Sequence, residues 1–171
     1  MLLNSSRPEG ARVSAFEISV PLRLTPGSKS LDREADLPPT GETVSFGMHG
    51  ALAGHYKATP ANPLPSTLDY LVATVGACLI GTFAGSLKRA KIPVSPDTLS
   101  ATATGVVGAD EDGVLVLRKV VVRYALELPD EHRDTAQEVH AAHAGRCPNA
   151  RSVSPAIEIA TDLEIVSPVA A

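Results

Sequence analysis

The sequence has no tryptophan, only two cysteines and two methionines, and aromatic residues make up 4% of it. Neither sign of charge is abundant, since 15 Lys and Arg against 19 Asp and Glu give a net charge of −4. A nucleic-acid-binding surface needs clustered cations that displace counterions, and the few cations here are scattered. We therefore expect no nucleic-acid partner. Apolar residues, at 44%, predict a folded globular chain.

Long hydrophobic runs are also lacking. The longest apolar stretch, Leu71 to Ala84, is shorter than the roughly 20 residues that span a bilayer, and threonines and glycines interrupt it. The amino terminus has no cationic segment followed by an apolar core and a small-residue cleavage site. We expect no membrane span and a cytoplasmic location.

The patterning predicts an α+β fold in a single domain, residues 1–171, because the length is that of one hydrophobic core. Residues 1–14 are expected to be flexible, residues 15–65 to be strand-rich, and residues 66–171 to hold the helices and later strands. Expected strands in the first part include residues 16–20 and 43–46, where apolar and polar residues alternate.

A proline-rich stretch, residues 59–65, stops regular structure, and a long helix begins directly after it. Ser66 and Asp69 have the spacing of a capping box at its start. The helix extends to about Ala90 and is apolar or small on nearly every face, so we expect it to be buried on all sides. The later predicted elements are a hairpin from Thr98 to Leu128, a helix from Glu131 to Ala144 ending at Gly145, a short helix starting at Cys147-Pro148, and a strand around residues 157–161.

The two cysteines are the main candidates for chemistry, because a cysteine pair in a reducing compartment is seldom a structural disulfide. Cys147 precedes a proline at a predicted helix start, where free backbone N–H groups and the adjacent Arg146 would lower its pKa. Cys78 lies in the middle of the apolar helix, where burial alone would keep it inert without a partner. Each cysteine taken singly is equally compatible with an ordinary small core residue.

Two segments together resemble a known family. Residues 67–78, Thr-Leu-Asp-Tyr-Leu-Val-Ala-Thr-Val-Gly-Ala-Cys, are similar to the first cysteine helix of the OsmC/Ohr proteins, and Cys147-Pro148 resembles their second cysteine motif. The order of elements between them agrees, and the resemblance extends from about Leu64 to Val166. It implies an OsmC-like fold in which antiparallel sheets wrap around long central helices of an intertwined homodimer, with active sites at the subunit interface.

The resemblance also implies a reaction. Cys78 would be the thiol that attacks a small hydrophobic hydroperoxide in a pocket lined by the apolar helix, and Cys147 would resolve the resulting sulfenic acid as a disulfide. An external dithiol of the lipoyl type would then reduce the disulfide, so no bound cofactor is expected. A non-catalytic protein of the same fold, which binds a small ligand or senses redox state, is the alternative function.

The sequence departs from the best-studied peroxidases of this family at two helper positions. Those enzymes place a glutamate ten residues before the first cysteine, and here Leu68 occupies that position while the acidic residue is Asp69, as in other branches. Asp69 is a tentative catalytic residue and, equally, a helix cap. Arg23 is the tentative partner arginine, with Arg12 and Arg33 as weaker candidates, and each is also compatible with a solvated surface residue.

A zinc site is the competing hypothesis for the second cysteine. His140, His143 and Cys147 have the spacing of one helix face and the ligand types that zinc prefers, with a fourth ligand from His132 or Asp134. A glycine and a proline before and after Cys147 are expected to break that helix, so we favour exposed histidines and expect no metal.

Overall fold

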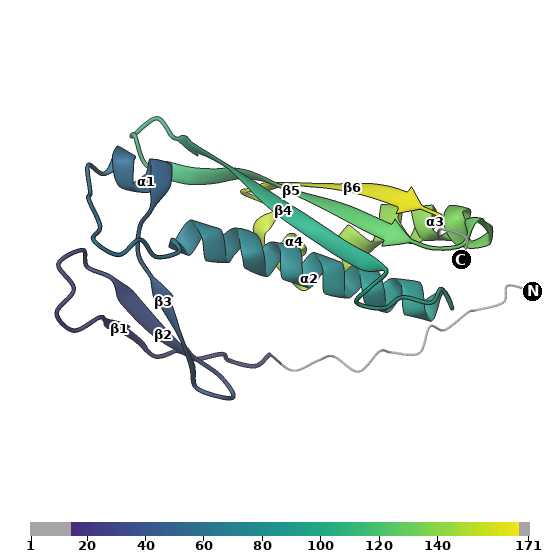
Figure 1. The fold of residues 1–171 in the computed structure, drawn as a ribbon, viewed down its shortest axis with the longest axis horizontal. Coiled ribbons are helices and arrows are strands. Elements are labelled where there is room, and N and C mark those ends of the chain that lie inside the picture. Colours follow the sequence, from purple (N-terminus) through teal and green to yellow (C-terminus); the bar gives the residue numbers. More distant parts are fainter. Residues whose placement is uncertain (1–14, 168–171) are drawn as a thin grey trace, which may run out of the picture.

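The computed structural model describes residues 15–167. The predicted flexible segment 1–14, with Arg12, lies outside the described residues. Figure 1 shows one long helix lying along a twisted sheet, with a second, smaller sheet beyond the amino-terminal end of that helix. The one-domain prediction stays a prediction, whereas the mixture of helices and sheets confirms an α+β architecture.

The smaller sheet consists of β1 (Leu22–Leu24), β2 (Arg33–Leu37) and β3 (Glu42–Phe46), which pair antiparallel in that order. The predicted strand at residues 43–46 is confirmed as part of β3. The one at residues 16–20 is wrong: these residues form no strand, and their side chains have no core to face, since Phe16 is 77% exposed. A short helix, α1 (Gly50–His55), was not predicted.

The long helix α2 (Thr67–Arg89) begins where the sequence predicts. The Ser66 hydroxyl accepts from the Asp69 N–H at 3.2 Å, and the Asp69 carboxylate accepts from the Ser66 N–H at 2.6 Å, so the capping box is confirmed. Within the single chain, α2 is not buried on all sides as expected. Larger side chains such as Leu79 and Phe83 are buried, whereas small residues, among them Ala73, Ala77 and Gly81, form an exposed face.

By length and composition alone, α2 is the one helix among residues 15–167 that is long and apolar enough to cross a membrane. The sequence-based expectation of no span considered a shorter apolar stretch within the 23 residues of this helix. A core helix passes the same test, and α2 packs against both strands of a hairpin and against two further helices. Its composition is therefore weak evidence for a membrane span.

The larger sheet contains the predicted hairpin, β4 (Leu99–Ala109) and β5 (Leu115–Glu127), and a last strand, β6 (Glu158–Val166). β4 and β5 are antiparallel, whereas β6 pairs parallel to β5. A parallel pair needs a long crossover, which α3 (Arg133–His143) and α4 (Pro148–Val153) provide. Alternate residues of β5 form the buried face of this sheet, which packs on α2: Val120, Val122, Tyr124 and Leu126.

The chain between α3 and α4 determines where the second cysteine lies. Ala144–Arg146 form a 3₁₀ turn that follows α3 without a break, so Gly145 is not the left-handed cap that the sequence predicts. The backbone then becomes extended at Cys147, which is the N-cap of α4, and Pro148 occupies the first turn. This start of α4 is confirmed.

Two glycines allow α2 to approach β4 closely. A Cβ atom on Gly76 would lie 2.7 Å from the Cβ of Ala103, and one on Gly105 would lie 2.5 Å from Cγ2 of Val72. Both distances are shorter than real Cβ contacts, so neither position accepts a side chain unless its neighbours shift. The helix that carries Cys78 is therefore held firmly against the sheet.

Candidate active site

The fold brings the two cysteines together from segments 69 residues apart in the sequence, α2 and the start of α4. Both are free thiols, and Cys78 lies near enough to Cys147 to raise the pKa of the Cys147 thiol. Cys78 is half-buried, whereas Cys147 is fully buried. The pair therefore combines a partly exposed cysteine with a fully buried one.

The environment of Cys147 differs from the sequence-based expectation of a lowered pKa. Burial raises the pKa of the Cys147 thiol, and its contact with Cys78 raises it further. The backbone of Ala150 in the first turn of α4 and the Thr82 side chain act on this pKa in the opposite direction. Burial prevails, so the net pKa is raised and the predicted lowering is corrected.

The face of α2 that packs against the start of α4 carries three residues spaced one helical turn apart: Thr74, Cys78 and Thr82. The Asn149 amide donates to the backbone oxygen of Thr74 at 3.1 Å and joins the two helices on one side of the cysteine pair. On the other side, the Thr82 hydroxyl donates to the Cys78 backbone oxygen at 2.8 Å, and the Thr82 side chain acts to lower the pKa of the Cys147 thiol. Sequence reasoning missed Thr82 and Asn149, although Thr82 has the i+4 spacing from Cys78 that signals a shared face.

A buried aromatic cluster lies behind Cys147, made of Phe83, Tyr124, His140 and His143. His143 is fully buried, and its Nδ1 lies 2.6 Å from the His140 carbonyl oxygen. A carbonyl only accepts, so Nδ1 carries the hydrogen and donates. Burial lowers the pKa of His143 and keeps it neutral, so Nε2 accepts from the Tyr124 hydroxyl at 2.9 Å.

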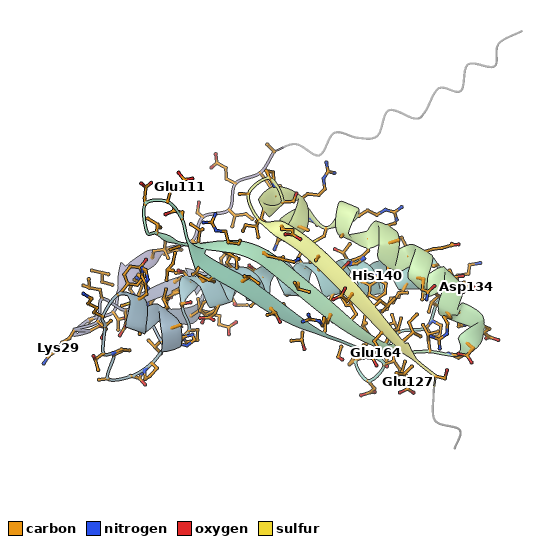
Figure 2. The ribbon with its side chains drawn as sticks, turned by 90° about the horizontal axis from the view of Figure 1, so that it is seen from above. Lys29, Glu111, Glu127, Asp134, His140 and Glu164 are labelled. Atoms are coloured by element: carbon orange, nitrogen blue, oxygen red, sulfur yellow. The ribbon has the colours of Figure 1, made fainter. Side chains whose placement is uncertain are left out.

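Burial and the nearby Cys147 raise the pKa of Tyr124, which places this hydroxyl within electrostatic range of the cysteine pair. Burial lowers the pKa of His140 and the neighbouring His143 imidazole lowers it further, while Asp162 of β6 acts to raise it. Figure 2 shows His140 on α3 beside β6. The predicted exposure of the two histidines is therefore corrected: His143 is buried and His140 is half-buried.

This geometry does not support the zinc alternative. Both ring nitrogens of His143 are engaged in hydrogen bonds, and a metal would have to displace one of them. Across residues 15–167, no group of three or more His, Cys, Asp or Glu side chains is arranged to hold a metal ion.

Asp69 lies far from Cys78 on the same helix. Nine residues correspond to two and a half turns, which places the two side chains on opposite faces and about 14 Å apart along the axis. The Asp69 carboxylate instead accepts from the Ser66 hydroxyl at 2.6 Å and lies 2.8 Å from Nε2 of His49. Burial acts to raise the pKa of Asp69, but these hydrogen bonds outweigh it and the pKa is lowered.

Arg23 is placed on β1, in the smaller sheet, and is engaged by two carboxylates of β2. Its guanidinium lies 2.7 Å from Glu34 and 2.5 Å from Asp36. Within one chain, neither tentative helper is brought to Cys78. The capping role of Asp69 is observed, and catalytic roles for Asp69 and Arg23 stay predictions.

An apolar groove of about 720 Å³ lies between α2 and β4, with Asp69 near one end. Gly76 lines it, and Cys78 is two residues further on, about 200° around the helix. The groove and the Cys78 thiol therefore face opposite sides of α2. The expected pocket lined by the apolar helix at the nucleophile stays a prediction.

Comparisons with known proteins identify relatives of this chain. The sequence model of the OsmC-like protein family matches residues 60–162, which include both cysteines. No curated protein matches the sequence. Among solved structures, an OsmC-like protein of unknown function from Vibrio cholerae has a TM-score of 0.69 at 16% identity, and covers 88% of this chain and 100% of its own.

Two further structures carry hydroperoxide names. The organic hydroperoxide resistance protein of Elizabethkingia anophelis has a TM-score of 0.64 at 18% identity, covering 90% of this chain and 99% of its own. The organic hydroperoxide resistance protein of Bacillus subtilis has a TM-score of 0.59 at 20% identity, covering 87% of this chain and 98% of its own. At these identities the likeness concerns the fold.

Proposed function

Because the chain belongs to the OsmC-like protein family, we propose that it reduces organic hydroperoxides through the thiols of Cys78 and Cys147. The observation that carries the proposal is the proximity of a half-buried cysteine and a fully buried one. The names of the relatives from Elizabethkingia anophelis and Bacillus subtilis support the choice of substrate class.

The exposure of the two thiols supports their roles. The thiolate of Cys78 attacks the outer peroxide oxygen, the O–O bond breaks, an alcohol leaves and Cys78 becomes a sulfenic acid. The Cys147 thiol then attacks the Cys78 sulfur, its proton and the sulfenic hydroxyl leave as water, and a disulfide forms. An external dithiol returns both thiols by exchange, so the cycle requires no bound cofactor, and we place it in the cytoplasm, where dithiols are kept reduced.

Mass spectrometry of the reduced protein after one equivalent of cumene hydroperoxide tests the pair. We expect a peptide linking Cys78 to Cys147, observed without reductant. Cys78→Ser should abolish peroxide consumption, whereas Cys147→Ser should allow one oxidation and then stall with a sulfenic acid that dimedone traps. Two unmodified thiols in the wild-type protein, or equal activity in the two variants, would refute the assignment.

We also propose that the active protein is a homodimer. Small exposed residues along α2 and apolar side chains of β1, Leu22 at 72% and Leu24 at 61% exposure, support an interface that covers them. Any contribution of Asp69 or Arg23 to Cys78 would then come from the second subunit. Sedimentation equilibrium tests the assembly, and a monomer at micromolar concentration would exclude it.

A non-catalytic function is the second candidate, because the apolar groove lies on the face of α2 opposite Cys78. A protein that binds a small apolar ligand there needs no reaction at the cysteines. Binding of an environment-sensitive apolar dye, unchanged in the Cys78→Ser variant and accompanied by no peroxide consumption in the wild type, would favour this function over the peroxidase.

A further inference from the structure

We propose that the chain binds a small apolar carboxylic acid in a pocket at the beginning of α2, with Arg33 as the group that receives the carboxylate. The pocket has a volume of about 450 Å³, which is within the range of small-molecule sites. Residues of β2, α1, α2 and β5 line it, and Figure 1 shows that these elements meet at one end of the molecule.

This pocket is separate from the proposed redox site. Thr67, which lines it, precedes Cys78 by three helical turns, about 16 Å along the axis of α2. It also differs from the groove between α2 and β4, although Leu68 lines both. A ligand in the pocket therefore takes no part in chemistry at the cysteines.

Arg33 is directed toward the interior of the fold. Alternation along β2 places it on the same face as Ala35, which is 2% exposed. Its neighbour across the strand pair is Phe46 of β3, whose ring packs on Tyr70 of α2 with the ring centroids 4.6 Å apart. This face of the smaller sheet is therefore turned toward α2.

The charge of Arg33 has no counterpart within residues 15–167. The side chain is half-buried, and its Nε atom is buried without a hydrogen-bond partner. Its guanidinium forms no ion pair with any described carboxylate, whereas Arg23 on the neighbouring strand pairs with both Glu34 and Asp36. A guanidinium keeps its charge when buried, and burying an unpaired charge is costly, so Arg33 is suited to receive an anion.

The remaining lining favours an apolar body with one polar head. The walls are formed by apolar side chains: Met48, Leu52, Leu68 and Leu115. The hydroxyl-bearing residues Tyr56 and Thr67 line the same pocket and offer two further donors. Apolar walls with a few converging polar groups are typical of a site for a small organic ligand.

The charges around the pocket select a singly charged anion. Among the described residues that line it, Arg33 is the one that carries a charge, and Thr67 places the positive end of the α2 dipole there. Asp32 lies behind the wall, since its Oδ1 atom would be 2.9 Å from a Cβ atom on Gly47, which lines the pocket. One guanidinium balances one carboxylate and matches its two oxygens, whereas a phosphate dianion would leave a charge uncompensated.

The test is calorimetric titration of the full chain with octanoate. We expect Arg33→Gln to weaken binding about ten- to a hundredfold, because the charge-assisted hydrogen bonds are lost. Arg33→Lys should weaken it less, since the charge remains but the fork is lost. Asp32→Asn should strengthen binding by removing a nearby negative charge.

Arg123→Gln is the matched control, because it changes the net charge equally at a residue that pairs with Asp162 on the exposed face of the larger sheet. It should bind octanoate as the wild type does. Octanol, which has the same apolar body without the charge, should bind wild type and Arg33→Gln equally. Equal octanoate affinity of wild type and Arg33→Gln would overturn the proposal.

A second measurement needs no variant to fold. The NMR signal of the Arg33 Nε–H group should shift when octanoate is added to the wild type, and much less with inorganic phosphate at the same concentration. No shift would overturn the proposal, and is the result expected if a carboxylate of a second copy already pairs with Arg33. Cys78→Ser should retain octanoate binding, so this site and the proposed peroxidase stand or fail separately.

Discussion

Removing the Tyr124 hydroxyl tests the buried network behind Cys147. Tyr124 is 2% exposed and His143 is fully buried, and the hydroxyl donates to Nε2 of His143 at 2.9 Å. Tyr124→Phe keeps the ring but leaves this nitrogen buried without a donor. Because water cannot replace the lost group, the cost is that of an unsatisfied buried acceptor, about 1–3 kcal/mol in the free energy of unfolding.

The assay is urea unfolding followed by circular dichroism, with a thermal scan at the same protein concentration. A loss of about 2 kcal/mol corresponds to a fall in Tm of about 4–8 °C for a chain of this size. Tyr70→Phe is the matched control, because Tyr70 is half-buried and its hydroxyl donates to the Ser45 carbonyl at 3.1 Å, where water can substitute. A loss below about 0.5 kcal/mol for Tyr124→Phe, or one equal to that of the control, would refute the tautomer and burial argument.

Two further perturbations address stability. Folding lowers the pKa values of His140 and His143, so the unfolded chain binds protons first as the pH falls. The free energy of unfolding should therefore decline from about pH 6.5 downward. Urea midpoints measured across a pH series test this. A free energy of unfolding that stays constant down to about pH 5 would contradict neutral buried histidines. Asp69 cannot account for a decline in this range, because its lowered pKa affects stability only below about pH 4. Ser66→Ala should remove the capping box and lower the free energy of unfolding by about 1 kcal/mol in urea titrations. Ser66→Thr should retain most of the stability that the cap provides. Equal stability of the wild type and both variants would disprove the contribution of the cap.

The balance of effects at Cys147 explains why a position at a helix start does not lower the pKa of this thiol. The extended N-cap geometry and the following proline place a backbone N–H near the sulfur, as the sequence predicts. That favourable contact is local, whereas the burial that opposes it comes from α2, α3 and the sheet packed around the residue. The accessible Cys78 is therefore the better candidate for the first encounter with a peroxide.

Local signals in the sequence determined the elements whose ends depend on neighbouring residues. The capping box of Ser66 and Asp69, the turn of the β4–β5 hairpin and the start of α4 at Pro148 all form as predicted. In each case the deciding interactions join residues a few positions apart. The cysteine pair was also found from the sequence, because two motifs and the order of elements between them resembled one family.

Only the tertiary structure decided features that depend on what packs against a residue from far along the chain. It made β6 parallel to β5, buried His143, brought Cys147 close to Cys78, and put the apolar groove on the opposite side of α2 from Cys78. Periodicity specifies which face of a helix is apolar, but it does not specify what covers that face. Burial, and with it the pKa of a thiol or an imidazole, follows from the covering elements and therefore from the fold as a whole.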